Sequence, residues 1–175
     1  MRVLRQFALL VTRPLAPFVA VMLSVSQAVA ADLAREGSYS IRFAWSGAFD
    51  ALEVGENHLV FVYTLQGVVT NNAGEGIFHN MSANCIGMGS SLDGAENNSG
   101  NCVYTDADGD KIFDEWEDEG TFGVGAKGSA TLIGGTGKYA GISGGGQYER
   151  FNVPAAAEGT FQGYIPDETG TYRLP

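Results

Sequence analysis

The segment YSIRFAW, residues 39–45, alternates large apolar side chains with small or polar ones. Because successive side chains of a β-strand point to opposite faces, this alternation predicts a strand with one buried face. An amphipathic α-helix would instead need apolar residues three and four positions apart, and no long stretch with that spacing follows. The segment therefore indicates a fold built from strands.

The rest of the chain repeats this pattern in short runs that Gly, Asn and Asp interrupt. All 25 glycines lie after residue 36, where they suit the turns, bends and bulges of a sheet. Short strands at this spacing are typical of an all-β barrel or sandwich, and a closed barrel leaves no exposed strand edge. Seven further strands are expected at 58–69, 76–88, 102–105, 111–116, 128–133, 147–153 and 159–165.

The first thirty residues have the organisation of a secretory signal peptide. Residues 1–13 carry three arginines and no acid, an uncharged apolar run follows at 15–25, and Ala-Val-Ala at 28–30 gives small residues before a cleavage point. A membrane anchor is the alternative, but the whole uncharged stretch, residues 14–31, is barely long enough to span a bilayer and contains two prolines. We therefore expect an exported protein, periplasmic or secreted. Its signal peptide (1–30) is removed, and its mature part (31–175) forms a single domain that is not in the membrane.

The charge of the mature part limits its partners. The whole chain has 10 basic and 20 acidic residues, and removal of three arginines with the leader leaves seven bases against 20 acids. Nucleic acids and anionic lipids are themselves negatively charged, so a surface with this excess of acids does not attract them. We therefore expect neither as a partner.

Cys85 and Cys102 are the only cysteines of the chain. An even count in an exported protein predicts one disulfide, and two unpaired buried thiols are the alternative. The segment between them is rich in Gly and Asn, so we expect a loop that the disulfide stabilises by roughly 3 kcal/mol.

The segment GGTGKYAGISG, residues 134–144, resembles a turn of the allene oxide cyclase and dirigent-protein barrel superfamily. In that superfamily a strand ends in Gly-Gly-Thr-Gly, a short turn carries a lysine and an aromatic residue, and Gly-x-x-Gly opens the next strand. The turn residues that the resemblance assigns are Gly134, Gly135, Gly137, Gly141 and Gly144.

The resemblance implies an eight-stranded antiparallel closed β-barrel with Gly-rich turns. It also implies a pocket at one end for a small hydrophobic ligand, and assembly of identical chains into trimers. No residues here match the pocket residues of plant allene oxide cyclases or the aspartates of dirigent proteins. The resemblance therefore implies a fold rather than an activity.

The most acidic segment, DADGDKIFDEWE at residues 106–117, has carboxylates at positions 1, 3, 5, 9 and 12. These are side-chain ligand positions of a twelve-residue Ca²⁺ loop. Two features oppose a helix-loop-helix calcium site: a lysine stands at position 6, where the loop favours Gly, and no helical pattern flanks the segment. The alternatives are a β-hairpin with an Asp-Gly turn and solvated acids, with or without a bound Ca²⁺. The candidate calcium ligands are Asp106, Asp108, Asp110, Asp114 and Glu117.

A catalytic set of residues is not evident from the sequence. Neither His58 nor His79 has a partner at metal-ligand spacing. His79 would face the barrel interior if the third strand is regular, and could there act as an acid or base. We expect a binding or structural module that holds a small apolar ligand at the barrel mouth and requires no cofactor. The alternatives are a cyclase- or isomerase-type or dirigent-like enzyme acting on a small hydrophobic substrate, and a Ca²⁺-stabilised interaction module.

Overall fold

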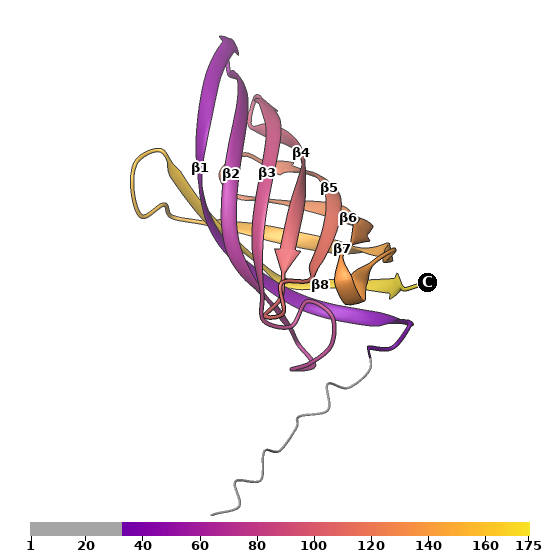
Figure 1. Ribbon diagram of the computed structural model, residues 1–175. Coiled ribbons are helices and arrows are strands. Elements are labelled where there is room, and N and C mark those ends of the chain that lie inside the picture. The colour runs from indigo at the N-terminus through magenta and orange to yellow at the C-terminus, as the bar shows by residue number, and fades with distance from the viewer. Residues whose placement is uncertain (1–32) are drawn as a thin grey trace, which may run out of the picture. The chain divides into compact units, whose positions relative to one another are not determined.

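Eight antiparallel strands close into a barrel in the computed structural model, which describes residues 33–175 (Figure 1). Each strand pairs with the next along the chain, and the last pairs with the first. This order confirms the all-β, closed, eight-stranded antiparallel barrel. The strands are β1 (Glu36–Gly55), β2 (His58–Asn71), β3 (Met81–Leu92), β4 (Ala95–Thr105), β5 (Lys111–Thr121), β6 (Gly125–Gly135), β7 (Ser143–Val153) and β8 (Thr160–Arg173).

Helix is almost absent from the described part of the chain. Within residues 33–175 the one helical element is the 3₁₀ turn η1 (Gly137–Tyr139). No helix in this range is long and apolar enough to cross a membrane. The predicted signal peptide, residues 1–30, lies outside the described residues.

The antiparallel order places alternate connections at opposite ends of the barrel. One end, which we call the capped end, carries the connections 72–80, 106–110 and 136–142. The other end, which we call the mouth, carries the turns 56–57, 93–94, 122–124 and 154–159. Four side chains from the capped-end connections are at most 4% exposed and close that end: Ile77, Phe78, Tyr139 and Ile142.

Strand β1 buries the face that the sequence pattern predicts. Tyr39, Ile41, Phe43 and Trp45 all belong to the hydrophobic core of the barrel. Burial of one large apolar side chain contributes about 1.5–3 kcal/mol, so a slip of one residue, which would expose all four, is strongly disfavoured. The alternation therefore sets which side chains reach the interior.

The third strand begins at Met81, five residues later than expected. Residues 76–80 form a turn instead, in which Phe78 and Asn80 adopt positive φ angles of 63° and 55°. This turn lets Phe78 fold over the barrel end as part of the cap. His79 lies in the same turn, so the prediction that it faces the interior from a strand is wrong.

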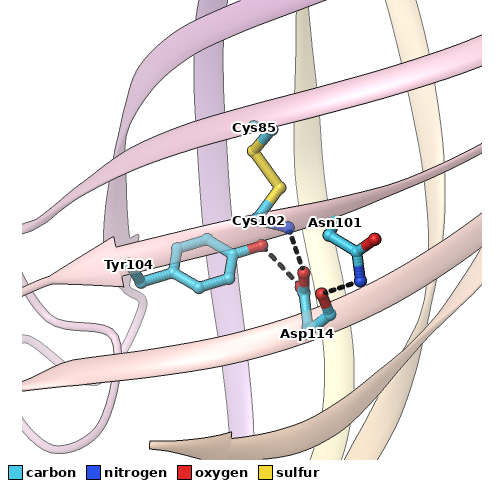
Figure 2. Close-up of a disulfide and its surroundings, with 5 residues drawn as sticks. All are labelled: Cys85, Asn101, Cys102, Tyr104 and Asp114. Carbon is cyan, nitrogen blue, oxygen red and sulfur yellow. Dashed lines mark hydrogen bonds between the residues drawn. A yellow bond between two sulfur atoms is a disulfide. The ribbon is translucent and has the colours of Figure 1, made fainter. Parts of the chain in front are cut away.

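Cys85 and Cys102 are opposite partners on β3 and β4, and the predicted disulfide between them is confirmed (Figure 2). Their Cα atoms are 4.1 Å apart, and both side chains are buried. The segment between them is a β-hairpin and not the loop that we expected. Asp93 and Gly94 have φ angles of 51° and 84°, the positive values typical of two-residue hairpin turns, so residues 95–101 pair with β3.

Candidate functional site

A cavity of about 280 Å³ lies inside the barrel and reaches the turn residues of the mouth. A space of this size holds one small ring system with a short substituent. Both tryptophans of the chain lie in its wall. The aromatic wall residues that the argument below uses are Phe43, Trp45, Tyr63, Trp116 and Phe161.

Two glycines make room for the tryptophan rings of this wall. Trp45 on β1 lies opposite Gly163 on β8, and Trp116 on β5 lies opposite Gly100 on β4. A Cβ added at either glycine would lie 2.5 Å from an atom of the opposite ring. The absent side chains let the rings lie against the neighbouring strand, which keeps the middle of the barrel open.

A buried cluster around Arg150 of β7 occupies the half of the cavity nearer the mouth. The Arg150 guanidinium donates to Asp118 on β5 (Nε–Oδ2 2.8 Å) and to Glu96 on β4 (Nη2–Oε1 2.6 Å). Asn98 and Tyr148 donate further hydrogen bonds to Asp118, at 2.9 and 3.1 Å. Burial alone would lower the pKa of Arg150, but its hydrogen bonds to Asp118 and Glu96 raise it above the ordinary value. This Arg150 cluster is therefore an ion-paired network, in which two carboxylates share one guanidinium.

Two further carboxyl groups lie deeper, toward the capped end. Asp114 on β5 accepts the Tyr104 hydroxyl at 2.8 Å and the Cys102 backbone N–H at 3.0 Å, as Figure 2 shows. Glu168 on β8 accepts the Tyr39 hydroxyl at 3.0 Å. The two carboxylate side chains are 2% and 5% exposed, and both line the cavity. Among residues 33–175, neither forms an ion pair with a lysine, arginine or histidine.

The environment of this Asp114–Glu168 pair favours its protonated form. Burial raises the pKa of Asp114 to about 7, although the hydrogen bonds from Tyr104 and Cys102 oppose the shift. Burial and then the negative charge of Asp114 raise the pKa of Glu168 to about 8, against the hydrogen bond from Tyr39. The pair can therefore take up or release protons near neutral pH, or balance a positive charge inside the cavity.

The cap positions the tyrosines that hold this pair. The Phe78 ring lies between Tyr39 and Tyr104, with ring centroids 5.2 and 5.0 Å away. Aromatic contacts of this kind contribute about 0.5–1.5 kcal/mol beyond burial. The turn at 76–80 thus fixes the floor of the cavity.

Three of the predicted calcium ligands lie in the turn between β4 and β5, where a lysine contacts them. Lys138 Nζ lies 2.6 Å from the Asp106 carboxylate and 2.7 Å from that of Asp108. The Asp110 carboxylate accepts the backbone N–H of Lys138 at 3.1 Å. A side chain of the Gly-rich segment thus supplies a cation to the acidic turn.

The other two predicted ligands lie on opposite faces of β5. Asp114 points into the barrel, whereas Glu117, three residues further along the strand, is exposed on the outer face. Strand alternation therefore keeps the five carboxylates apart. Within residues 33–175, no group of three or more His, Cys, Asp or Glu side chains is placed to hold a metal ion. The structure corrects the five-ligand arrangement, and calcium binding at the turn itself stays a prediction, with Lys138 as the competing cation.

The Gly-rich segment connects β6 to β7 around η1 at the capped end. Gly137 has a φ of 55°, and a Cβ there would collide with the Asp110 carboxylate, so the two motifs that the sequence singles out pack on each other. At Gly135 an added Cβ would lie 2.5 Å from the Lys111 carbonyl oxygen. The remaining turn glycines, Gly134, Gly141 and Gly144, have φ angles of 145°, 76° and 129°.

The sequence analysis missed the four charged residues that matter most beside Asp114: Glu96, Asp118, Arg150 and Glu168. Alternation places Asp114 and Asp118 on the buried face of β5 with Ile112, and two acids on a buried face were a signal that could have been used. His58 begins β2, and neither histidine lines the cavity.

Comparisons with known proteins bear on the fold. No protein-family model and no curated protein sequence matches the chain. Among solved structures, a pterocarpan synthase dirigent protein matches with a TM-score of 0.51 and 11% sequence identity, over 91% of this chain and all of that one. This similarity supports the dirigent-like barrel that the Gly-rich segment implied; it does not show a link to allene oxide cyclases.

Proposed function

We propose that the barrel is a binding module that holds one small, mainly apolar molecule in its cavity without transforming it. The observation that carries this proposal is the aromatic cavity itself, which two cross-strand glycines keep open. A barrel built only for stability would fill this space with side chains, because unfilled volume in a core is destabilising.

Binding is testable with a neutral probe, because both tryptophans line the cavity. We expect tert-butylbenzene to change the tryptophan emission of the protein saturably. Ala130→Leu, which adds side-chain volume on the cavity face of β6, should weaken this binding. Thr131→Leu places the same side chain on the outer face of the same strand and should leave binding unchanged. Absence of saturable binding to the natural protein would overturn the proposal.

A cyclase- or isomerase-type or dirigent-like activity on a small hydrophobic substrate is the second candidate. It is favoured by Asp114 and Glu168, whose pKa values near neutrality suit proton transfer to a bound substrate. Incubation of candidate substrates with the protein, followed by mass spectrometry and NMR of the recovered compound, distinguishes the two. Catalysis should be lost in Asp114→Asn and Glu168→Gln, whereas the recovered compound stays unchanged if the barrel only binds.

Export is proposed on the leader pattern of residues 1–30 and on the Cys85–Cys102 disulfide, which needs an oxidising compartment to persist. The expected result is a mature protein that begins at residue 31, measured by intact mass of the exported fraction. An unprocessed chain with two alkylatable thiols would contradict it.

Assembly into trimers is proposed on the resemblance to dirigent barrels. Apolar side chains exposed on the outer faces of β2 and β3, among them Val62, Ile86 and Met88, support self-association. Light scattering after size-exclusion chromatography should give three times the monomer mass, and a monomer at every concentration would exclude it.

A further inference from the structure

The lining of the cavity has more acids than bases. Four carboxyl groups face it, from Glu96, Asp114, Asp118 and Glu168, and Arg150 is the one basic side chain among the lining residues. Glu96 and Asp118 hold Arg150 between them. The Asp114–Glu168 pair is left without a cation in the described part of the chain.

The strands packed around the Asp114–Glu168 pair do not supply a cation to it. The titratable groups that interact with the pair are the hydroxyls of Tyr39 on β1, Tyr104 on β4 and Tyr148 on β7. The charged groups that line the same cavity are Glu96 on β4, Asp118 on β5 and Arg150 on β7. The hydroxyls are donors, and Arg150 is committed to its own two acids. A buried carboxylate without a compensating positive charge is costly, so the free energy of the ligand-free protein favours protonation of the pair.

The aromatic side chains that line the cavity around the Asp114–Glu168 pair suit a cation that carries an apolar body. Trp45, Trp116 and Tyr63 line the cavity, and the centroids of the Tyr63 and Trp116 rings are 6.2 Å apart. Aromatic faces attract ammonium groups, more strongly where water is excluded. The same rings would cover the apolar part of a ligand.

A second observation at the same site points to a ligand. The Trp45 indole N–H is buried and has no hydrogen-bond acceptor among the described residues. The Trp45 side chain is 8% exposed and forms part of the cavity wall. Buried indole donors usually find a partner, so the site favours a ligand whose apolar body carries an acceptor atom, separate from its charged group.

We propose that the cavity takes an organic cation: a small amine or quaternary ammonium compound with an aromatic or apolar body. Its charged group lies against Asp114 and Glu168, and its body lies against Trp45, Trp116 and Tyr63. This inference rests on the proposed binding function and names its ligand class. The bound cation brings one positive charge to the Asp114–Glu168 pair, as Arg150 does to Glu96 and Asp118. Binding of the cation therefore releases protons from the pair, and affinity increases with pH.

Two probes of the same shape separate charge from size. Phenyltrimethylammonium carries a permanent positive charge, and tert-butylbenzene is its neutral counterpart, with carbon in place of nitrogen. Tryptophan fluorescence measures the Kd of each from pH 6 to pH 9. We expect the Kd of the cation to fall at least about tenfold over this range as the pair ionises, and that of the neutral probe to stay constant.

Variants assign the effect to the pair. The double variant Asp114→Asn, Glu168→Gln keeps the side-chain shapes and should remove the pH dependence and the preference for the cation, while tert-butylbenzene still binds. Glu117→Gln removes a charge from the outer face of β5 and should change neither Kd. The pH dependence of the natural protein is itself a test, so a double variant that fails to fold does not remove the experiment.

The outcomes distinguish the two proposals. If tert-butylbenzene binds but the cation binds no better at pH 9 than at pH 6, the inference fails and the binding function stands. Cation binding that survives the double variant with its pH dependence intact also overturns the inference. If neither probe binds at any pH, both proposals fail.

Discussion

The Arg150 cluster and the Asp114–Glu168 pair lie in the same barrel and differ in what balances their charge. Both consist of two carboxyl groups that are almost fully buried. In the first, one guanidinium, 2.6 and 2.8 Å away, forms an ion pair with both of them. In the second, tyrosine hydroxyls and a backbone N–H donate hydrogen bonds but bring no charge. The comparison teaches that the first two acids have a cation within the fold, whereas the second two are left to protons or a ligand.

Loss of the compensating cation should have the largest effect. Arg150→Met leaves Glu96 and Asp118 buried without a partner, and we expect it to lower the free energy of unfolding by about 3–5 kcal/mol. Urea denaturation at pH 7.5 measures this. Adding Glu96→Gln and Asp118→Asn to Arg150→Met should recover much of the loss, because no uncompensated charge remains. A cost below about 1 kcal/mol for the single variant would show that Arg150 does not form these buried ion pairs in solution.

Removal of a carboxyl group from the Asp114–Glu168 pair should instead raise the free energy of unfolding at alkaline pH. The folded-state pKa of Glu168, about 8, lies above its ordinary value of 4.5. Its contribution to stability is therefore fully present below about pH 4.5 and is lost as the pH rises through 8. Glu168→Gln does not ionise, so it should be more stable than the natural protein by up to about 4 kcal/mol at pH 8.5 and nearly equal at pH 4.5.

Urea midpoints at the two pH values test this prediction. Glu117→Gln, on the outer face, serves as the control and should show no such pH dependence. The same difference in stability at pH 4.5 and pH 8.5 would mean that Glu168 is not held protonated by its surroundings.

The smallest effect on stability is expected for the ion pairs that Lys138 forms at the surface. Lys138 is 40% exposed where it contacts Asp106 and Asp108, so water and salt screen the interaction. Lys138→Gln should cost about 0.2–1 kcal/mol at low ionic strength and less in 0.5 M NaCl. Thermal unfolding at both salt concentrations measures it. A salt-independent loss of several kcal/mol would show that the turn depends on Lys138 for more than charge.

Alternation alone predicted much of the fold but only part of the site. It placed the apolar face of β1 inside the barrel, and the same rule applied to β5 puts Asp114 on the face that carries Ile112 and Trp116. It could not locate Glu168, which lies beyond the predicted end of the last strand. There, Ile41 and Phe43 of β1 pair with Glu168 and Ile165, so β8 contains one extra residue, and this bulge turns Glu168 inward.

No local pattern in the sequence predicts the contacts of Arg150 either. Its partners Glu96 and Asp118 precede it by 54 and 32 residues, and they come together only when the sheet closes. The five-ligand calcium arrangement is corrected for a related reason, because Asp114 and Glu117 lie on opposite faces of β5, whereas calcium binding at the turn stays a prediction.

A ¹³C-detected NMR titration of the carboxyl groups tests the central contrast most directly. Asp114 and Glu168 are assigned from the spectra of Asp114→Asn and Glu168→Gln, and their chemical shifts are followed from pH 3 to pH 10 in the ligand-free protein. The account predicts that these two groups titrate with midpoints near 7 and 8. Midpoints of both groups close to 4, the ordinary range of carboxyl groups in water, would show that the pair is solvated or already compensated, and would contradict the account.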